Sequence, residues 1–266
     1  MELVGKRRRM KRILKGGKAL IVPMDHGITK PVEGIQRIDD ILRTIDGIAD
    51  AVVLHKGVVK HSSYVAEMEM GLIVHLSAST SYHANEKVII CSVEKAIELG
   101  ADAVSIHVNV GSETECEQIR DAGIISEACD KYGMPLLAMM YPRGKDVAIA
   151  AETVKHAVRV GYELGADIVK TNYTGSVESF AEVVEYVPIP VVVAGGSRKS
   201  DEKLLEEVAQ AMLAGAAGVA IGRNVFQHNN PAAIVKALKR VIHNGISVEE
   251  AMEVLYERNL VTNRGR

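Results

Sequence analysis

Apolar runs and helical patterns alternate along the chain and meet in a repeated joint. The joint is clearest at Glu98–Val108, Glu163–Tyr173 and Leu213–Arg223, and Ile45–Gly57 is a looser version. In each, an amphipathic helix ends at a glycine, Ala-Asp or Ala-Ala follows, and a run of apolar and β-branched residues comes next. Glycine commonly follows a helix because it tolerates the left-handed conformation. A helix-to-strand joint that recurs in this way predicts a parallel sheet.

Eight apolar runs are candidate strands, and several are continuously apolar, as strands covered on both faces should be. Helical patterns lie between most of them, whereas the link Lys56–Gly71 is short and poorly helical. Eight βα units in about 250 residues predict an α/β fold, the (β/α)8 TIM barrel. A doubly wound open sheet is the alternative, but the first strand–helix turn lacks the GxGxxG pattern. The candidate strands are Ala19–Asp25, Ala51–His55, Leu72–Leu76, Ala103–Val108, Pro135–Tyr141, Ile168–Thr171, Val191–Ala194 and Gly218–Ile221.

We expect residues 1–266 to form a single barrel domain. Of the 266 residues 47% are hydrophobic and 25% are charged, which is typical of a globular protein, and α/β barrels often reach this length as one domain. Residues 1–18 form a basic N-terminal extension, and residues 247–266 form a C-terminal helix and tail. The extension is either an arm for an anionic surface or nucleic acid, or, as we favour, a short helix whose Met10, Ile13 and Leu14 contact the body.

Composition narrows the class of protein. A net charge of −2 gives no case for nucleic-acid binding, and no apolar stretch reaches the roughly 18 residues that a membrane span needs. The basic start lacks the apolar core and cleavage site of a signal peptide. Cys91, Cys116 and Cys129 have no CxxC spacing, so we expect reduced thiols rather than disulfides or a zinc site. Together these features predict a cytoplasmic protein with neither a membrane nor a nucleic-acid partner.

Polar and titratable residues gather where the candidate strands end, which is the rim that carries the active site in such barrels. Lys170 is the first candidate, because period-2 alternation places it on one face with Ile168 and so allows it to point into the barrel. A low-dielectric interior favours the neutral form of an amine, which attacks a ketone to form an imine, an electron sink. The alternative is a lysine that reaches the solvent or pairs with Asp25.

Other rim residues suit partner roles. Asp25 ends the first strand, where a carboxylate can take a proton from a substrate hydroxyl, although it can also cap a helix or pair with Lys170. Tyr141 ends the fifth strand and can donate a proton to a leaving oxygen, and Arg143 follows it and can reach an anionic group. Each of these two residues also has a plainer reading, as a rim aromatic and as a solvated cation.

The last two strands end in glycine-rich loops, Ala194–Ser197 and Gly222–Asn224. Barrels often hold phosphate there, because glycines let backbone N–H groups approach the oxygens. Arg223 can add a bidentate contact. We therefore expect a phosphate site at these two loops, although glycines also serve in tight turns.

Histidines raise a competing metal hypothesis, since His26, His55, His75 and His107 all lie near the ends of the first four strands. Few carboxylates accompany them, and no HExxH pattern is present, so we favour substrate hydrogen bonding or packing for each histidine. Lys56 is a rival imine lysine, but alternation places it on the opposite face from His55.

Six motifs, in order and at barrel spacing, closely resemble the archaeal-type class I aldolase family: VPMDHG, SIHVNVGS, MMYPRG, ADIVKTNYTG, VVVAGG and GVAIGRNVFQH. The resemblance runs from about Ala19 to Asn244. Within that family the chain is more similar to the 2-amino-3,7-dideoxy-D-threo-hept-6-ulosonate synthases than to the sister branch, the class I fructose-bisphosphate aldolases. The sister branch has a tryptophan two positions before the tyrosine of the YPRG motif, where this chain has Met139 and contains no tryptophan at all.

The resemblance implies that Lys170 forms the Schiff base, that Asp25 is the general base and that Tyr141 donates a proton. It implies no metal and no organic cofactor, only the covalent imine on Lys170. One departure is Asn172, where relatives carry Ser or Lys, and we expect it to alter detail rather than chemistry. The implied substrate contacts are His26, Gly27, Ile28, Thr29, Pro142, Arg143, Thr171, Asn172, Gly195, Gly196, Gly222 and Arg223.

The implied reaction is a transaldolase-type exchange between a phosphorylated keto-sugar, 6-deoxy-5-ketofructose 1-phosphate, and an aldehyde, L-aspartate semialdehyde. It yields 2-amino-3,7-dideoxy-D-threo-hept-6-ulosonate and hydroxypyruvaldehyde phosphate, on a route to 3-dehydroquinate and aromatic amino acids. The resemblance also implies a homo-oligomer such as a decamer. The alternatives are a class I fructose-1,6-bisphosphate aldolase, a metal-free barrel isomerase with Asp25 as its base, and a phosphosugar-binding protein without catalysis.

Overall fold

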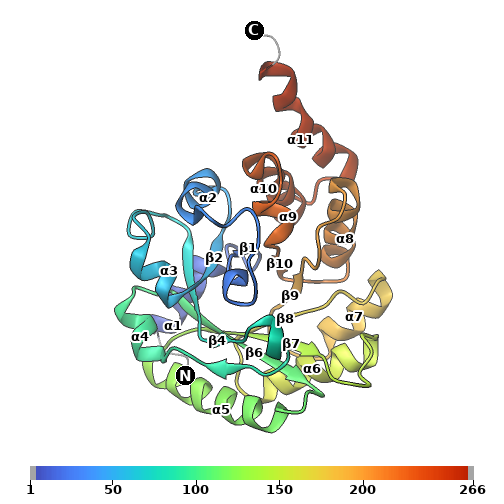
Figure 1. The fold of residues 1–266 in the computed structure, drawn as a ribbon. Coiled ribbons are helices and arrows are strands. Elements are labelled where there is room, and N and C mark those ends of the chain that lie inside the picture. Colours follow the sequence, from blue (N-terminus) through green and yellow to red (C-terminus); the bar gives the residue numbers. More distant parts are fainter. Residues whose placement is uncertain (1–3, 263–266) are drawn as a thin grey trace.

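A closed barrel of parallel strands forms the centre of the molecule (Figure 1). The computed structural model describes residues 4–262, and within them eight strands close the barrel in the order β1-β10-β9-β8-β7-β6-β3-β2. The TIM-barrel prediction is therefore confirmed, and each candidate strand matches an observed strand to within two residues at either end. The strands are β1 (Ala19–Pro23), β2 (Ala51–His55), β3 (Gly71–His75), β6 (Ala103–Val110), β7 (Leu136–Pro142), β8 (Ile168–Thr171), β9 (Val191–Ala194) and β10 (Gly218–Ala220).

Helices surround the barrel and connect successive strands (Figure 1). The connection from β2 to β3 contains only a helix of six residues, α3, which agrees with the poorly helical sequence of that link. A short antiparallel hairpin of β4 (Ser77–Ala78) and β5 (Val88–Ile89) follows β3, and no pattern in the sequence predicted it. The helices are α2 (Ile38–Ile45), α3 (Lys56–His61), α4 (Val93–Glu98), α5 (Glu115–Tyr132), α6 (Ala151–Glu163), α7 (Val177–Glu185), α8 (Asp201–Leu213), α9 (Arg223–Phe226) and α10 (Pro231–Lys239).

The repeated joint has the predicted geometry. Gly100, Gly165 and Gly215 follow helices and have φ angles of 79°, 89° and 92°, which lie in the left-handed region that glycine adopts without strain. The aspartate of the joint binds the backbone of a neighbouring strand. Asp102 accepts a hydrogen bond of 3.0 Å from the backbone N–H of Leu72, at the start of the strand before it. This aspartate therefore connects the joint to the neighbouring strand of the barrel.

The N-terminal helix α1 (Val4–Ile13) closes the lower mouth of the barrel, at the amino ends of the strands. Ile13 is fully buried and packs with Leu14 against inward-facing strand residues such as Ile73 and Ile168. In the structure, residues 4–13 of the basic extension thus form a helix that packs on the body.

Charges at this closure pair the extension with the aspartates of three joints. Lys6 Nζ lies 2.8 Å from Asp167 Oδ1, and Arg12 Nε lies 2.7 Å from Asp102 Oδ1. Lys15 Nζ lies 3.7 Å from Asp50 Oδ1, which is completely buried. The basic residues of α1 and the segment after it thus neutralise carboxylates that the barrel would otherwise bury beside its own strands.

Apolar side chains form two layers, one inside the barrel and one between the barrel and its helices. On β8, Ile168 belongs to the inner layer and Val169 to the outer one, so alternation directs the next residue, Lys170, inward. At the other end of the chain, α11 (Val248–Thr262) extends away from the barrel beyond α10 and contacts α8 and α10 (Figure 1). It lies within residues 247–266, where a C-terminal helix and tail were expected, and residues 263–266 lie outside the described residues. Between residues 4 and 262 no helix is long and apolar enough to cross a membrane.

Candidate active site

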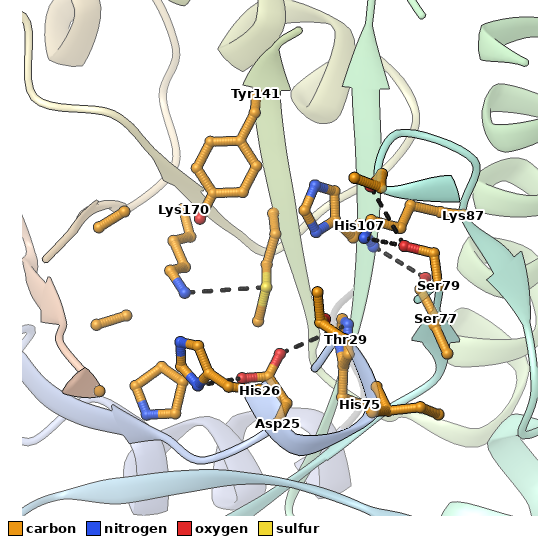
Figure 2. A pocket seen from close by; sticks show the side chains of 18 of the residues that line it. Asp25, His26, Thr29, His75, Ser77, Ser79, Lys87, His107, Tyr141 and Lys170 are labelled. Atoms are coloured by element: carbon orange, nitrogen blue, oxygen red, sulfur yellow. Dashed lines mark hydrogen bonds and ion pairs between the residues drawn. The ribbon is translucent and has the colours of Figure 1, made fainter. Parts of the chain in front are cut away.

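A cavity of about 300 Å³ opens at the carboxyl ends of the barrel strands. Lys170, Asp25 and Tyr141 all line it, although they come from β8, the loop after β1 and β7, and in Figure 2 their side chains point into the same space. The structure therefore brings together the three residues expected to carry the chemistry.

Lys170 is buried, with only 7% of its surface exposed. Its amine lies 3.9 Å from the sulfur of Met139 and makes no ion pair with any carboxylate among residues 4–262 (Figure 2). The alternative of a lysine fixed in an ion pair with Asp25 thus has no support in the geometry. A buried amine without a carboxylate partner is costly to keep, and its retention indicates a chemical use.

Asp25 lies directly after β1, where the chain turns into the short 3-10 helix His26–Ile28. Its carboxylate oxygens lie 3.5 Å from His26 Nδ1 and 3.8 Å from His75 Nε2. Burial by itself would raise the pKa of Asp25. In the acid range where this carboxyl titrates, the charges of His75, His26 and Lys170 outweigh burial and hold that pKa below its ordinary value. Asp25 is therefore an ionised carboxylate beside Lys170 at neutral pH, which a general base has to be.

All four strand-end histidines line the cavity. Burial lowers the pKa of His26, His55 and His107, and it lowers the pKa of His75 to about 3, so these imidazoles are neutral at neutral pH. Both ring nitrogens of His55 are buried and find no hydrogen-bond partner among the described residues. A neutral imidazole in that state is a ready donor or acceptor for a substrate hydroxyl.

Metal ligation was the competing hypothesis for these histidines. In the part of the chain that the structure describes, no group of three or more His, Cys, Asp or Glu side chains is arranged to hold a metal ion. His107 has a different partner, because its Nε2 shares a hydrogen bond of 2.8 Å with Asn109 Oδ1.

Tyr141 and Arg143 lie together at the end of β7. The Tyr141 side chain is buried to 5% exposure, and its ring packs against the ring of His107 at a centroid distance of 5.0 Å. The Arg143 guanidinium lies 4.6 Å from the centroid of the Tyr141 ring, in a cation–π contact. The phenol and the guanidinium thus reach the cavity from one strand end.

The loops after β9 and β10 supply the opposite wall of the cavity with Gly195, Gly196, Gly222 and Arg223. Glycine is required at Gly222, because a Cβ atom there would lie 2.4 Å from the carbonyl oxygen of Pro23 and 2.7 Å from His26 Cε1. The Nε atom of Arg223 is buried and without a hydrogen-bond partner among residues 4–262. Arg223 therefore brings a hydrogen-bond donor without a protein partner to the cavity wall.

The structure places most of the other expected contacts on the cavity wall, but not all. His26, Ile28, Thr29 and Asn172 line it, whereas Gly27, Pro142 and Thr171 do not. Thr171 is fully buried, and its hydroxyl donates a 2.8 Å hydrogen bond to the carbonyl of Met140, so alternation turns it away from Lys170. Gly27 borders a neighbouring apolar groove instead, and Pro142 is a buried residue of β7.

Sequence reasoning missed two groups of lining residues. Ser77, Ser79 and Lys87 come from the β4–β5 hairpin, and Lys30 comes from the loop after β1. The rival lysine, Lys56, does not line this cavity, and its amine donates to the carbonyl of Ile90. A polar hairpin directly after a strand end was the available signal, but strands of two residues leave almost no periodicity to detect.

Comparison with known proteins gives the class first. Residues 19–228 match the family described as DeoC/LacD family aldolase, and the chain belongs to this family of enzymes. A solved archaeal fructose 1,6-bisphosphate aldolase superimposes with a TM-score of 0.83 at 32% identity, over 90% of this chain and all of that one. A related archaeal aldolase, also at 32% identity and a TM-score of 0.83, was solved with its catalytic lysine bound to the carbinolamine intermediate; the match covers 89% of this chain and 99% of that one.

Two curated relatives are more similar in sequence. The 2-amino-3,7-dideoxy-D-threo-hept-6-ulosonate synthase 1 of Archaeoglobus fulgidus is 57% identical over 261 residues, which cover 97% of this chain and 98% of the relative. The 2-amino-4,5-dihydroxy-6-oxo-7-(phosphonooxy)heptanoate synthase of Streptomyces griseus is 48% identical over 235 residues, or 85% of each chain. The resemblance to class I aldolases and to their synthase branch is thereby confirmed.

Proposed function

We propose that this protein is a lysine Schiff-base transaldolase that makes 2-amino-3,7-dideoxy-D-threo-hept-6-ulosonate. The observation that carries the proposal is the buried Lys170 amine, without a carboxylate partner among the described residues, in a cavity shared with Asp25 and Tyr141. The 57% identical synthase of Archaeoglobus fulgidus supports the choice of product.

The first half of the reaction breaks a carbon–carbon bond. The neutral amine of Lys170 attacks the C5 ketone of 6-deoxy-5-ketofructose 1-phosphate, and loss of water gives a protonated imine. Asp25 removes the proton of the C3 hydroxyl, the C3–C4 bond breaks, and its electron pair moves into the imine to give an enamine. Hydroxypyruvaldehyde phosphate leaves, and a hydroxyacetone unit remains on Lys170.

The second half forms a new bond at the same carbon. The enamine carbon attacks the aldehyde carbon of L-aspartate semialdehyde, and the new alkoxide receives a proton that Tyr141 supplies. Water then hydrolyses the imine, releases the product and restores the amine of Lys170. The Arg143 guanidinium over the Tyr141 ring stabilises the phenolate form when the proton is transferred.

The proposed contacts divide by position in the barrel. Gly195, Gly196, Gly222 and Arg223 line the side of β9 and β10, and we assign them to the ketone half of the substrate. In this reaction that half carries no phosphate, so the phosphate site expected at these loops stays a prediction. His26, Ile28, Thr29 and Asn172 line the same cavity and supply further contacts. Gly27, Pro142 and Thr171 act indirectly, by holding in place the cavity-lining residues next to them in the chain.

Reductive trapping tests the proposal. Sodium borohydride added with 6-deoxy-5-ketofructose 1-phosphate should convert the imine to a stable amine, and peptide mass mapping should place the adduct on Lys170. The Lys170→Met variant should form no adduct and should lose turnover. An adduct on Lys56, or no adduct at all, would overturn the assignment, and it would leave a barrel isomerase or a sugar-phosphate-binding protein as the remaining functions.

Fructose-1,6-bisphosphate aldolase is a second candidate, because solved archaeal enzymes with that activity superimpose on 89–90% of the chain. The two activities separate in one assay, which compares turnover of the two sugar phosphates with and without L-aspartate semialdehyde. The main proposal expects turnover of the deoxy-sugar to depend on the semialdehyde.

We further propose a cytoplasmic homo-oligomer that needs neither a metal nor an organic cofactor. An imine on Lys170 supplies the electron sink that a metal or cofactor would otherwise supply. Dialysis against EDTA should leave turnover unchanged, and light scattering in solution should give a mass of several chains.

A further inference from the structure

The cavity carries far more positive than negative charge. Besides the reacting Lys170, its lining residues within 4–262 include four cationic side chains and a single carboxylate, Asp25. The cationic residues are Lys30, Lys87, Arg143 and Arg223. Since each of these cations is costly to hold near the others without a counter-charge, the cavity is suited to an anionic ligand.

Lys87, like Lys30, is a cation that no expectation from sequence included. It lies directly before β5, so the β4–β5 hairpin carries it over the mouth of the barrel, and its side chain reaches down to the cavity (Figure 2). Its amine donates a hydrogen bond of 2.5 Å to Ser79 Oγ and makes no ion pair with a carboxylate of residues 4–262. Neighbouring charges in the cavity include Arg143, which repels Lys87, and Asp25, which attracts it.

The charge state of Lys87 supports the same conclusion. Burial first, and then the positive charge of Arg143, lower the pKa of Lys87 to about 8. A bound anion would relieve that repulsion and raise the pKa again. Two cations that face one cavity from different elements, each without an ion-pair partner in the described part of the chain, form a built anion site.

The order of strands places this site relative to the reacting lysine. β8, which carries Lys170, has β9 and β7 as its two neighbours in the barrel. Gly195, Gly222 and Arg223 therefore lie on the β9–β10 side of Lys170. Arg143 at the end of β7, and Lys87 on the hairpin that leaves β3, lie on the other side. A ketone bound to Lys170 has two arms, so the two groups of residues can each take one arm.

We infer that Lys87 and Arg143 form an anion subsite for the aldehyde fragment, the part of the substrate across the carbon–carbon bond that breaks and forms. The inference rests on the proposed function and adds to it. In that reaction the departing aldehyde carries a phosphate and the arriving aldehyde carries a carboxylate, and both must occupy the same place beside the enamine carbon. One pair of cations serves both in turn, and Lys87 is thereby a residue that determines acceptor specificity.

Variants at Lys87 test the inference through acceptor preference. Lys87→Met should raise the KM for L-aspartate semialdehyde about 10- to 100-fold, which corresponds to the loss of one charged hydrogen bond. It should change kcat/KM for propanal, a neutral acceptor, by less than about twofold, since no charge is recognised there. Lys87→Arg should keep most of the preference for the charged aldehyde. The matched control is Lys145→Met, because Lys145 is exposed and does not line the cavity.

Two kinetic outcomes would overturn the inference. One is an equal loss for both acceptors in Lys87→Met, which would indicate a general structural role. The other is an unchanged KM for L-aspartate semialdehyde.

A labelling experiment tests the subsite without turnover. Acetylation of Lys87 by an N-hydroxysuccinimide ester, followed by mass spectrometry, should slow several-fold in the presence of 4-hydroxybutyrate, a carboxylate with the same carbon chain as the acceptor. Inorganic phosphate should protect Lys87 as well, whereas 4-hydroxybutyramide, the neutral analogue, should not. Equal protection by the acid and the amide, or protection by neither anion, would contradict the subsite. If Lys170 formed no borohydride adduct while both anions protected Lys87, the proposed function would fail and the anion site would stand.

Discussion

His75 lies between Ser105 and Asp25 and contacts both. Its Nδ1 atom shares a 2.8 Å hydrogen bond with Ser105 Oγ, and its Nε2 atom lies 3.8 Å from Asp25 Oδ2. Because an ionised carboxylate only accepts hydrogen bonds, the proton of the neutral ring belongs on Nε2, with the serine hydroxyl donating to Nδ1. Ser105 thus fixes the ring that orients the proposed base, and His75 is a positioning residue.

Replacing His75 should therefore slow the reaction more than it weakens binding. We expect His75→Leu to lower kcat about 10- to 100-fold with little change in KM for the sugar phosphate. His75→Gln should retain more activity, because its amide can donate to Asp25 from nearly the same place. The acid limb of the pH–rate profile should move to higher pH in His75→Leu, since burial raises the pKa of Asp25 once His75 no longer opposes it. An unmoved acid limb, with Gln no better than Leu, would refute this role.

Removing the base should separate imine formation from bond cleavage. Asp25→Asn should lower kcat about 10²- to 10⁴-fold, the usual contribution of general base catalysis. Borohydride should still trap hydroxyacetone on Lys170 in this variant, because imine formation with a simple ketone needs no proton removed from a C3 hydroxyl. Loss of trapping together with turnover would mean that Asp25 acts on Lys170 itself.

The free energy of unfolding should begin to fall below about pH 6.5, which is well above the pH at which carboxylates titrate. Burial lowers the pKa of His26, His55 and His75 from the ordinary value of 6.5, to about 3 for His75. Between those limits the unfolded chain binds more protons than the folded one, so the free energy of unfolding falls as pH drops below about 6.5. Each histidine contributes a slope of up to about 1.4 kcal/mol per pH unit.

Urea denaturation at pH 7.5, 6 and 5 measures this slope. His75→Gln removes one titrating group and should make the slope shallower. A stability that is constant from pH 7.5 to 5 would show that these histidines are not held neutral in the folded state.

The closure of the barrel base should contribute to stability through Lys6. Its side chain is 9% exposed, and it pairs with Asp130 at 2.9 Å and with Asp167 at 2.8 Å. Lys6→Met leaves the partly buried Asp167 without its cation and should lower the free energy of unfolding by about 2 kcal/mol. Arg8 is exposed and makes no ion pair with residues 4–262, so Arg8→Met should change stability by less than about 0.5 kcal/mol. Equal effects of the two substitutions in thermal or urea denaturation would argue against the closure.

The barrel could be predicted from the sequence because its signals are local. A glycine after a helix and an apolar run after Ala-Asp are both visible within a dozen residues, and Gly100 and Gly165 have the left-handed geometry that they indicate. Alternation also placed Lys170 inside the barrel, because Ile168 two residues earlier is an inward-facing residue. The three residues proposed for the chemistry followed from these patterns and from the aldolase motifs.

The rest of the site depends on contacts that alternation within one strand does not reveal. Lys87 comes from a hairpin whose two strands have two residues each, so no period marks it, and its position depends on how the hairpin folds over the barrel. Thr171 was included because the aldolase resemblance implied a substrate contact there, yet the same alternation that turns Lys170 inward turns Thr171 outward to Met140. The pairing of Ser105 with His75 joins neighbouring strands and follows from the register of β3 and β6.

The ion pairs beneath the barrel have a consequence for the order of folding. Lys6 binds Asp130, which is 124 positions away, and it also binds Asp167, which is farther along the chain. Contacts over such separations form only after a large loop has closed, and that entropic cost delays them. We therefore expect the lower mouth to be sealed in a late kinetic phase, so a shortened chain that stops before Asp167 would leave Lys6 with only one of its two aspartates.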